Sequence, residues 1–188
     1  DLLINVTPKD FDVATDATPE QIKPQCRRAI IIGRRFRLVH VMFGAETIEV
    51  STYRAGASGE QAVDAQGRML ADNVFGNQAE DAARRDFTIN ALYYDPTTET
   101  VIDYHDGVKD IKRRRLRMIG DPRARYREDP VRMLRAVRIA AKLGFEIDEA
   151  TRAPIARMAD LLGYVPPARL FDEMLKLLTS GHSVACIL

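Results

Sequence analysis

Lys9-Asp10-Phe11-Asp12-Val13-Ala14 places two aspartates one residue apart near the start of the chain. If this stretch is a strand, side chains alternate between its faces, so Asp10 and Asp12 point the same way, roughly 7 Å apart. Phe11 and Val13 then face the opposite side, where a core could take them. Two converging carboxylates repel each other unless a cation lies between them, and hard divalent cations suit that position. The spacing alone is also compatible with two solvated turn aspartates.

A third carboxylate is available on a second predicted strand. Segment 47–53 alternates apolar and polar residues, which predicts a strand with one buried face, and Glu49 lies on its polar face. A sheet that places Glu49 beside Asp10 and Asp12 would complete a three-carboxylate metal site. Paired Mg²⁺ ions roughly 4 Å apart serve in-line phosphoryl or nucleotidyl transfer. Taken alone, Glu49 also fits an ordinary surface position.

Composition sets the broad class. The chain has 188 residues, 46% of them hydrophobic, so it can form one large domain or two small ones with a buried core. No apolar run approaches the ~20 residues of a membrane span. The first residue is Asp1 and the last residues are apolar without a capping signal, so we expect a piece of a longer protein. Cys26 and Cys186 lack ligand-like companions, which favours a reducing cytoplasm over a disulfide framework or zinc site.

Positive charge is concentrated in one segment. The net charge of the chain is only +1, but residues 109–138 contain twelve Lys or Arg against four Asp or Glu. A nearly neutral protein with one basic segment suggests a polyanionic partner. A solvated basic face is the alternative.

The first part of the chain reads as short strands and helices. Thr18 and Gln21 form a predicted capping box around Pro19, which opens a helix to about Arg28. Further elements follow from periodicity and from breaker residues: a buried strand at 30–32, strands at 38–43 and 47–53, a loop at 55–67, a helix at 78–84, a hairpin formed by 91–94 and 101–103, a basic helix at 107–114 and a strand at 116–119.

From Asp121 onward the pattern becomes helical. Asp129 before Pro130 predicts an N-cap and a helix that runs to Gly144, and Asp148 starts another helix, which Pro154 kinks or restarts. A last helix covers 168–179, with five apolar residues predicted as core, namely Leu170, Phe171, Met174, Leu175 and Leu178. We therefore predict an α+β fold with a mixed α/β head over 1–120 and an all-helical module over 121–188.

Three motifs in this order resemble one family. Arg84-Arg85-Asp86-Phe87-Thr88-Ile89-Asn90-Ala91 lies between Asp10-Phe11-Asp12 and Glu128-Asp129-Pro130-Val131-Arg132. Together they resemble the bacterial-type (class II) tRNA nucleotidyltransferase and poly(A) polymerase superfamily over essentially the whole chain. The resemblance implies a nucleotidyltransferase-type head with a small mixed sheet and helices. A helical neck that binds RNA and nucleotide would follow the head.

The resemblance also implies roles for single residues. Asp10 and Asp12 would hold two Mg²⁺ ions with Glu49 as third ligand, and Asp10, Asp12 and Asp86 would be catalytic. Nucleotide binding would fall to five residues, Arg84, Asp86, Asn90, Asp129 and Arg132. Taken alone, 84–86 also fits a surface ion pair at a helix end. The glycine pair that the family carries further upstream has no counterpart here, so its triphosphate contacts are assigned to no residue.

The third motif contains one residue that local structure does not explain. Capping explains Asp129, with a contribution of about 1 kcal/mol. Arg132 is different, because a cation in the first turn of a helix opposes the helix dipole. In the family, the Asp and Arg of this motif lie along the edge of the incoming base and read it. A guanidinium and a carboxylate together offer the donors and acceptors for that role.

Two segments favour one branch of the superfamily. Segments 31–41 and 70–76 are similar to those of bacterial poly(A) polymerases rather than of CCA-adding enzymes. Arg34, Arg35 and Arg37 would add RNA phosphate contacts that do not depend on base sequence, although a basic turn between strands is the alternative. The expected activity is the addition of AMP from ATP to RNA 3′ ends.

Three other functions stay open at this level. They are a CCA-adding enzyme, a non-catalytic RNA-binding domain that kept the fold, and a metal-dependent hydrolase. Intact Asp10 and Asp12 argue against the binding domain, and a hydrolase would release nucleotide without adding it to RNA. The oligomeric state is also open, with a monomer as one alternative.

Overall fold

The computed structural model describes residues 2–8, 11–33, 37–55 and 75–187. The chain divides into a first unit, residues 1–84, and a second unit, residues 85–188, which are described separately. Several sequence predictions lie outside the described residues, among them those for Asp10, for Arg34 and Arg35, for most of the loop at 55–67 and for residues 70–74.

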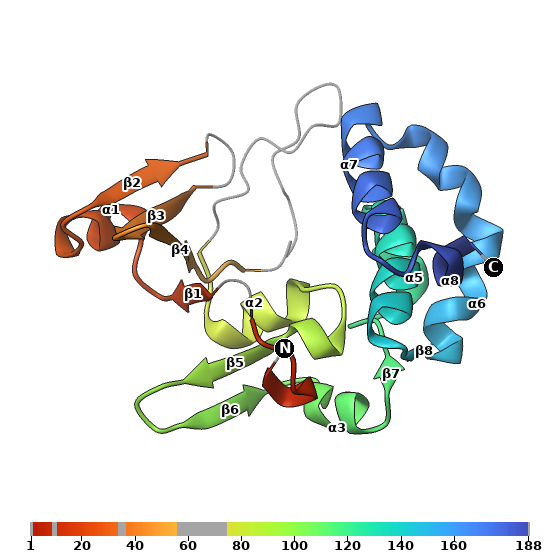
Figure 1. Cartoon of the computed structure of the whole chain (residues 1–188), viewed down its shortest axis with the longest axis horizontal. Coiled ribbons are helices and arrows are strands. Elements are labelled where there is room, and N and C mark those ends of the chain that lie inside the picture. The colour runs from red at the N-terminus through yellow and green to blue at the C-terminus, as the bar shows by residue number, and fades with distance from the viewer. Residues whose placement is uncertain (1, 9–10, 34–36, 56–74, 188) are drawn as a thin grey trace. The chain divides into compact units, whose positions relative to one another are not determined.

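A four-stranded mixed sheet organises the first unit (Figure 1). It contains β1 (Asp12–Thr15), β2 (Ala29–Ile32), β3 (Leu38–Phe43) and β4 (Glu46–Thr52) in the order β1-β4-β3-β2. Strand β1 runs parallel to β4, whereas β4 with β3 and β3 with β2 are antiparallel. The chain therefore leaves β1, forms β2 and β3, and returns with β4 between β1 and β3.

A small core lies against the central strand β3. Ile22 of α1 (Pro19–Ile22) packs with Val39 and Val41, which are 0% and 4% exposed. The predicted capping box forms, since the Thr18 amide donates to Gln21 Oε1 at 2.8 Å. The helix is shorter than expected. A 3₁₀ turn, η2 (Lys23–Gln25), follows it and contains Pro24, which lacks a backbone donor and cannot extend the helical ladder.

Two predictions of buried residues were wrong, both for residues at the edges of the sheet. Strand β2 forms where expected, but it is an edge strand and Ile30 is 53% exposed. The predicted core positions Phe11 and Val13 are 64% and 43% exposed, and β1 begins only at Asp12. Val13 and Ile30 lie on edge strands, which have a neighbouring strand on one side only, and Phe11 precedes β1, so each has fewer neighbours to cover it than the sequence pattern suggested.

Helix α2 (Gln78–Arg84) completes the first unit and has the predicted bounds. Its buried Asp81 accepts a hydrogen bond from the Arg54 amide at 3.2 Å, just beyond the end of β4. The Gly76 amide donates to the Tyr53 carbonyl at 2.9 Å. These contacts fix the start of α2 beside the end of β4. A short 3₁₀ turn, η1 (Leu2–Ile4), lies near the N-terminus.

The second unit begins with the predicted hairpin and basic helix. A 3₁₀ turn, η3 (Thr88–Asn90), precedes β5 (Leu92–Asp95), which pairs antiparallel with β6 (Thr100–Asp103). Helix α3 (Gly107–Lys112) packs so closely on η3 that a Cβ at Gly107 would lie 2.3 Å from the Thr88 carbonyl oxygen. The strand expected at 116–119 is reduced to β7 (Arg115–Leu116), which pairs parallel with β8 (Glu146–Ile147).

Helices make up the rest of this unit, in the order α4 (Pro122–Glu128), α5 (Val131–Leu143), α6 (Glu149–Met158), η4 (Ala159–Tyr164), α7 (Pro167–Leu178) and α8 (Ser183–Ile187). Helix α5 ends at Gly144, in the left-handed region with φ of 62°, as expected for a glycine C-cap. Helix α6 starts after the Asp148 N-cap and continues through Pro154 without restarting. None of the helices in the described ranges is long and apolar enough to span a membrane.

One core joins the start of this unit to its helices. Phe87, Leu116 and Met118 pack in the same buried cluster as Tyr126 and Met133. Residues 85–120 therefore pack with the helices, and the two compact units divide after Arg84. The domain boundary near residue 120, which rests on the change of sequence pattern, stays a prediction.

The predicted core of helix α7 differs most from the structure. Phe171 is 63% exposed and Leu178 51%, and the exposed set also includes Met174 and Leu175. The buried side chains are Glu173 and Leu177. On the buried face, Glu173 forms an ion pair with Arg138 of α5.

Candidate active site

The first part of the candidate site is a pair of carboxylates on parallel strands. Asp12 of β1 lies opposite Glu49 of β4 in the strand register. Side chains at matching positions of adjacent strands point to the same face. Both residues are exposed. Parallel pairing therefore brings these two predicted metal ligands together, although the sequence places them far apart.

His40 adds a group that none of the sequence motifs includes. It lies opposite Glu49 on β3, with its Nε2 atom 3.8 Å from Glu49 Oε2. Asp12, Glu49 and His40 thus occupy one row across three strands. The signal for this was available only in the register, because an isolated histidine in a strand carries no such information.

The donor set fits a hard divalent cation. Exposed carboxylate oxygens are the ligands that Mg²⁺ prefers. Within the described ranges, no group of three or more His, Cys, Asp or Glu side chains is arranged to hold a metal ion. Asp10, the third predicted ligand, lies outside those ranges, so two of the three expected ligands are described.

The second part of the candidate site surrounds Asp86. Its Oδ2 atom accepts from Nε and Nη2 of Arg135 at 2.8 and 2.7 Å. Its Oδ1 atom accepts from the Phe87 amide at 2.8 Å and from Asn90 Nδ2 at 3.2 Å. Asp86 and Asn90, both predicted nucleotide-binding residues, are therefore hydrogen-bonded to each other.

The cation that faces Asp86 is not one that the sequence motif suggested. The motif pointed to Arg84 and Arg85, but Arg135 lies 49 residues further along the chain. Burial alone would lower the pKa of the Arg135 guanidinium, and the charge and hydrogen bonds of Asp86 outweigh that effect and raise it. Arg85 instead stacks over the Tyr93 ring at 5.1 Å and donates to the Asn90 carbonyl at 3.3 Å.

The third part is the turn between α4 and α5. Glu128 Oε2 accepts from Arg125 Nη1 at 2.8 Å and from Arg132 Nη1 at 2.9 Å. Arg132 also donates to the Arg125 carbonyl at 2.9 Å. Burial first, and then the nearby charge of Arg132, lower the pKa of Arg125.

This arrangement explains the placement of Arg132 without invoking a ligand. Its guanidinium lies at the last turn of α4, where a cation is favourable for the helix dipole, and it is only 16% exposed. Arg132 lies in the first turn of α5, as predicted, and the favourable position of its guanidinium at the end of α4 offsets the opposition to the α5 dipole.

Asp129 does not cap α5, contrary to the prediction. It is the C-cap residue of α4, and Pro130 is the N-cap residue of α5, where no side chain caps the helix. The side chain of Asp129 turns toward α7 instead, and its Oδ2 atom accepts from Arg169 Nη2 at 2.9 Å. Its Oδ1 atom is buried and has no hydrogen-bond partner among the described residues.

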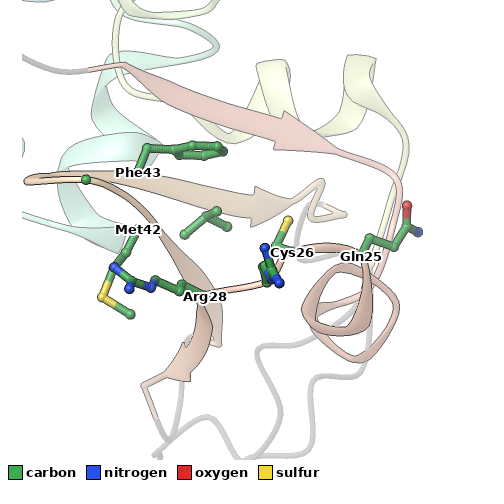
Figure 2. Close-up of a pocket in the computed structure, with 8 residues that line it drawn as sticks. Gln25, Cys26, Arg28, Met42 and Phe43 are labelled. Carbon is green, nitrogen blue, oxygen red and sulfur yellow. The ribbon is translucent and has the colours of Figure 1, made fainter.

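The remaining described candidates lie in the first unit. Arg37, predicted to bind RNA, forms an ion pair with Glu20. Arg84 is half-buried at the end of α2. An open hollow lies at the end of the β3–β4 hairpin, where Figure 2 shows Cys26, Arg28 and Phe43 around it. None of the predicted site residues lines it.

Comparison with known proteins first defines the class. The chain resembles the Bacillus stearothermophilus CCA-adding enzyme, whose crystal structure is a complex with CTP, with a TM-score of 0.82 and 32% identity. The likeness covers 99% of this chain and 44% of that one. The fold is therefore a nucleotidyltransferase-type head with a small mixed sheet, followed by helices, as predicted.

The family follows from the sequence. The family described as "Poly A polymerase head domain" matches residues 1–117, and one described as "Probable RNA and SrmB- binding site of polymerase A" matches residues 144–188. The chain belongs to the poly(A) polymerase head domain family.

Curated relatives agree with this assignment. Poly(A) polymerase I of Escherichia coli O6:H1 is 55% identical over 97% of this chain and 40% of its own length. The CCA-adding enzyme of Lactobacillus helveticus is 36% identical over 97% of this chain and 45% of its own length. The chain thus spans less than half the length of either relative.

Proposed function

We propose that this chain carries the catalytic head and the start of the neck of a template-independent RNA nucleotidyltransferase, which adds AMP from ATP to RNA 3′ ends. The observation that carries the choice of reaction is 55% identity to a poly(A) polymerase I, against 36% to a CCA-adding enzyme over a similar span. Residues 1–120 would form the head domain and residues 121–188 the RNA- and nucleotide-binding neck. We place the protein in the cytoplasm, on the basis of its cysteine usage and its proposed RNA substrate.

The proposed reaction is an in-line displacement. The RNA 3′-hydroxyl oxygen bonds to the α-phosphorus of ATP, the bond from that phosphorus to the bridging oxygen breaks, pyrophosphate leaves, and the hydroxyl proton passes to solvent. Asp10, Asp12 and Glu49 would hold two Mg²⁺ ions, which activate the hydroxyl and offset the charge on the leaving group. The parallel register of Asp12 with Glu49 supports this assignment, because it aligns oxygen donors on one face of the sheet.

Recognition of ATP would fall to residues around the third motif. Adenine offers an exocyclic amine as donor and ring nitrogens as acceptors along its edge. Asp129 has an oxygen without a partner among the described residues, which suits the amine, and Arg132 supplies donors for a ring nitrogen. Arg84, Asp86 and Asn90 would complete the nucleotide site.

RNA would be held largely through its phosphates. Arg34, Arg35 and Arg37 would contribute contacts that depend on salt and not on base sequence. Such contacts suit RNA 3′ ends of varied sequence.

CCA addition to tRNA is the second candidate. The structural likeness to a CCA-adding enzyme favours it specifically, with a TM-score of 0.82 at 32% identity. Both activities use the same motifs, so the described site residues do not separate them.

The test uses the full-length protein with Mg²⁺, a generic RNA and each nucleoside triphosphate in turn, and then a tRNA that lacks its 3′ end. We expect long tails on generic RNA from ATP alone. Additions of C, C and A that stop on the tRNA would move the assignment to CCA addition. Extension of neither RNA would leave a non-catalytic RNA-binding domain, and release of free nucleotide without extension would indicate a hydrolase.

A further inference from the structure

We propose that a basic patch at the end of α3 binds phosphates of the RNA substrate and forms an RNA contact surface of its own. The patch is defined by five exposed cations, namely Lys109, Lys112, Arg113, Arg114 and Lys142. None of them is among the residues assigned above to metal, nucleotide or RNA. The inference rests on the proposed function, because it takes RNA as the substrate.

The structure divides the twelve cations of segment 109–138 into two equal groups. Six form ion pairs with carboxylates, namely Arg115, Arg117, Arg125, Arg132, Arg135 and Arg138. The other six are exposed and form no ion pair with any described residue, namely Lys109, Lys112, Arg113, Arg114, Arg123 and Arg127. Half of the positive charge of the segment is therefore available to a partner.

The acids of the same segment do not neutralise this second group. Each of the four already has a partner, which is Arg117 for Asp110, the Ala124 amide for Asp121, Arg125 for Glu128 and Arg169 for Asp129. Cations without a nearby counter-charge repel one another, and a bound polyanion relieves that repulsion.

Four of the six available cations gather at the end of α3. Lys109 lies three residues before Lys112 and four before Arg113, so these side chains are neighbours on the helix surface. Arg114 follows at once, with a φ of 54° in the left-handed region. Glycine usually occupies this region just after a helix, so the sequence keeps a cation where an uncharged residue would be less strained.

The pairing of β7 with β8 adds the fifth cation. Arg115 of β7 lies opposite Glu146 of β8, which brings the end of α3 beside the end of α5. Arg114 Nη2 donates to the Gly144 carbonyl at 3.4 Å. Lys142 lies two residues before Gly144, in the last turn of α5, and is exposed. The patch therefore spans the ends of two helices that are distant in the chain.

The charge of the patch exceeds what its own elements need. Two exposed carboxylates lie next to it, Asp106 just before α3 and Glu146 at the start of β8. Five cations against two acids leave an excess of three positive charges. One cation in the last turn complements the dipole of a helix, so the ends of α3 and α5 account for only part of this excess.

RNA phosphates fit the patch better than an acidic protein surface does. A protein interface usually has an apolar centre inside a polar rim. Around the patch, Leu116 is fully buried, and Val108 and Ile111 are not exposed either. Contacts to phosphates need only cations and no apolar centre.

The experiment measures binding of a labelled single-stranded oligoadenylate to the full-length protein, by fluorescence anisotropy at several salt concentrations. Lys112→Ala/Arg113→Ala removes two phosphate contacts, so the slope of log affinity against log salt should fall by about 1.4 and the affinity about tenfold or more. In RNA extension, KM for RNA should rise while kcat and KM for ATP stay within about twofold, because the patch acts on RNA binding alone.

The matched control is Arg123→Ala/Arg127→Ala. It removes two exposed cations of the same segment from α4, a helix that packs against α5 and α6, whereas α3 packs against η3 and β7. Its slope should stay within about 0.3 of the wild-type value. Lys112→Arg/Arg113→Lys keeps both charges and should bind RNA as wild type does, because phosphate contacts of this kind depend on charge.

Two results would overturn the inference. One is an unchanged slope in Lys112→Ala/Arg113→Ala, which would leave an acidic protein surface as the partner of the patch. The other is an equal fall of the slope in Arg123→Ala/Arg127→Ala, which would show a diffuse effect of net charge. If the alanine variant does not fold, as judged by thermal unfolding, Lys112→Gln/Arg113→Gln replaces it with the same expected fall. Wild-type protein that binds RNA but does not extend it from ATP would overturn the proposed function and not this inference.

Discussion

The two units hold their charged site residues in different ways. In the first unit, backbone pairing of β1 with β4 places Asp12 and Glu49, and both carboxylates remain exposed. In the second unit, arginines hold the acidic residues, as Asp86 with Arg135 and Asp129 with Arg169 illustrate. Metal ligands need free lone pairs, whereas groups that recognise a base need a fixed direction. If Asp12 and Glu49 hold metal and Asp86 and Asp129 bind the nucleotide, as proposed, then strand register positions the former pair and side-chain ion pairs position the latter.

The sharpest test of this contrast is Asp12→Ala. If Asp12 holds catalytic metal, kcat for RNA extension should fall about a thousandfold or more. The free energy of unfolding should stay within about 0.5 kcal/mol, because an exposed carboxylate makes little contribution to stability. Activity assays and urea denaturation on the same preparation measure both. Asp16→Ala, an exposed aspartate just after β1, serves as control.

Activity within about threefold of wild type in Asp12→Ala would remove the metal role of β1. The metal role would also be excluded if Asp12→Ala and the control Asp16→Ala lost activity to the same extent.

The opposite outcome is expected for Glu173→Ala in the second unit. It leaves Arg138, only 15% exposed, without its partner, and breaking a buried pair in this way costs about 3 kcal/mol or more. Urea denaturation should show the loss as a lower midpoint with an unchanged slope. Glu149→Ala removes a carboxylate from an exposed pair and should cost less than about 0.5 kcal/mol. Equal costs for the two variants would mean that the buried pair does not hold α7.

A smaller effect, the dependence of stability on pH, tests the buried core of the second unit at Tyr126. Burial raises the pKa of Tyr126 to about 12, while an unfolded tyrosine titrates near pH 10. The raised pKa means that the unfolded state loses its proton first, so this contribution to stability is complete below about pH 10 and is lost up to about pH 12. At pH 11 the loss should be about 1.4 kcal/mol relative to pH 8.

Tyr126→Phe should flatten this part of the stability profile, at the cost of the hydrogen bond to the Thr151 carbonyl at 2.8 Å. Tyr164→Phe, at a residue 85% exposed, should leave the profile as in wild type. A profile of Tyr126→Phe that declines as steeply as wild type above pH 10 would contradict the assignment.

The smallest expected effect concerns RNA affinity in the first unit. Arg37→Ala should weaken binding of a generic RNA only a few-fold and reduce the slope of log affinity against log salt by about 0.7, as for one phosphate contact on a single strand. Fluorescence anisotropy at several salt concentrations measures the slope. Lys23→Ala removes another exposed cation of this unit and should leave the slope unchanged. Equal slopes for wild type and Arg37→Ala would remove Arg37 from the RNA site.

Much of the local structure followed from local signals. The capping box at Thr18 and Gln21, the helix at 78–84 and the hairpin after Asn90 form as predicted. The alternation at 47–53 also placed Glu49 on the polar face of its strand. These features depend on neighbours within a few residues, which a sequence pattern contains.

The misplaced features depend on partners that are distant in the chain. Asp129 looked like a helix cap because Pro130 follows it, but Arg169 lies 40 residues away and draws the side chain toward α7. The stripe on α7 looked like core because it is apolar, but the face that packs within this chain is the one with Glu173, which pairs with Arg138. The periodicity of a helix shows that it has two faces, yet it does not show which face another helix will cover.

The sequence by itself thus determined the class of fold, the carboxylates suited to metal and the motif suited to base recognition. It did so because residue type and short-range spacing set strand alternation, helix caps and the chemistry of each group. Only the tertiary structure decided that Asp12 lies opposite Glu49, that Arg135 holds Asp86 and that Arg169 holds Asp129. Strand register and ion pairing between helices depend on how elements that are distant in the chain pack together. A local sequence pattern does not contain that information.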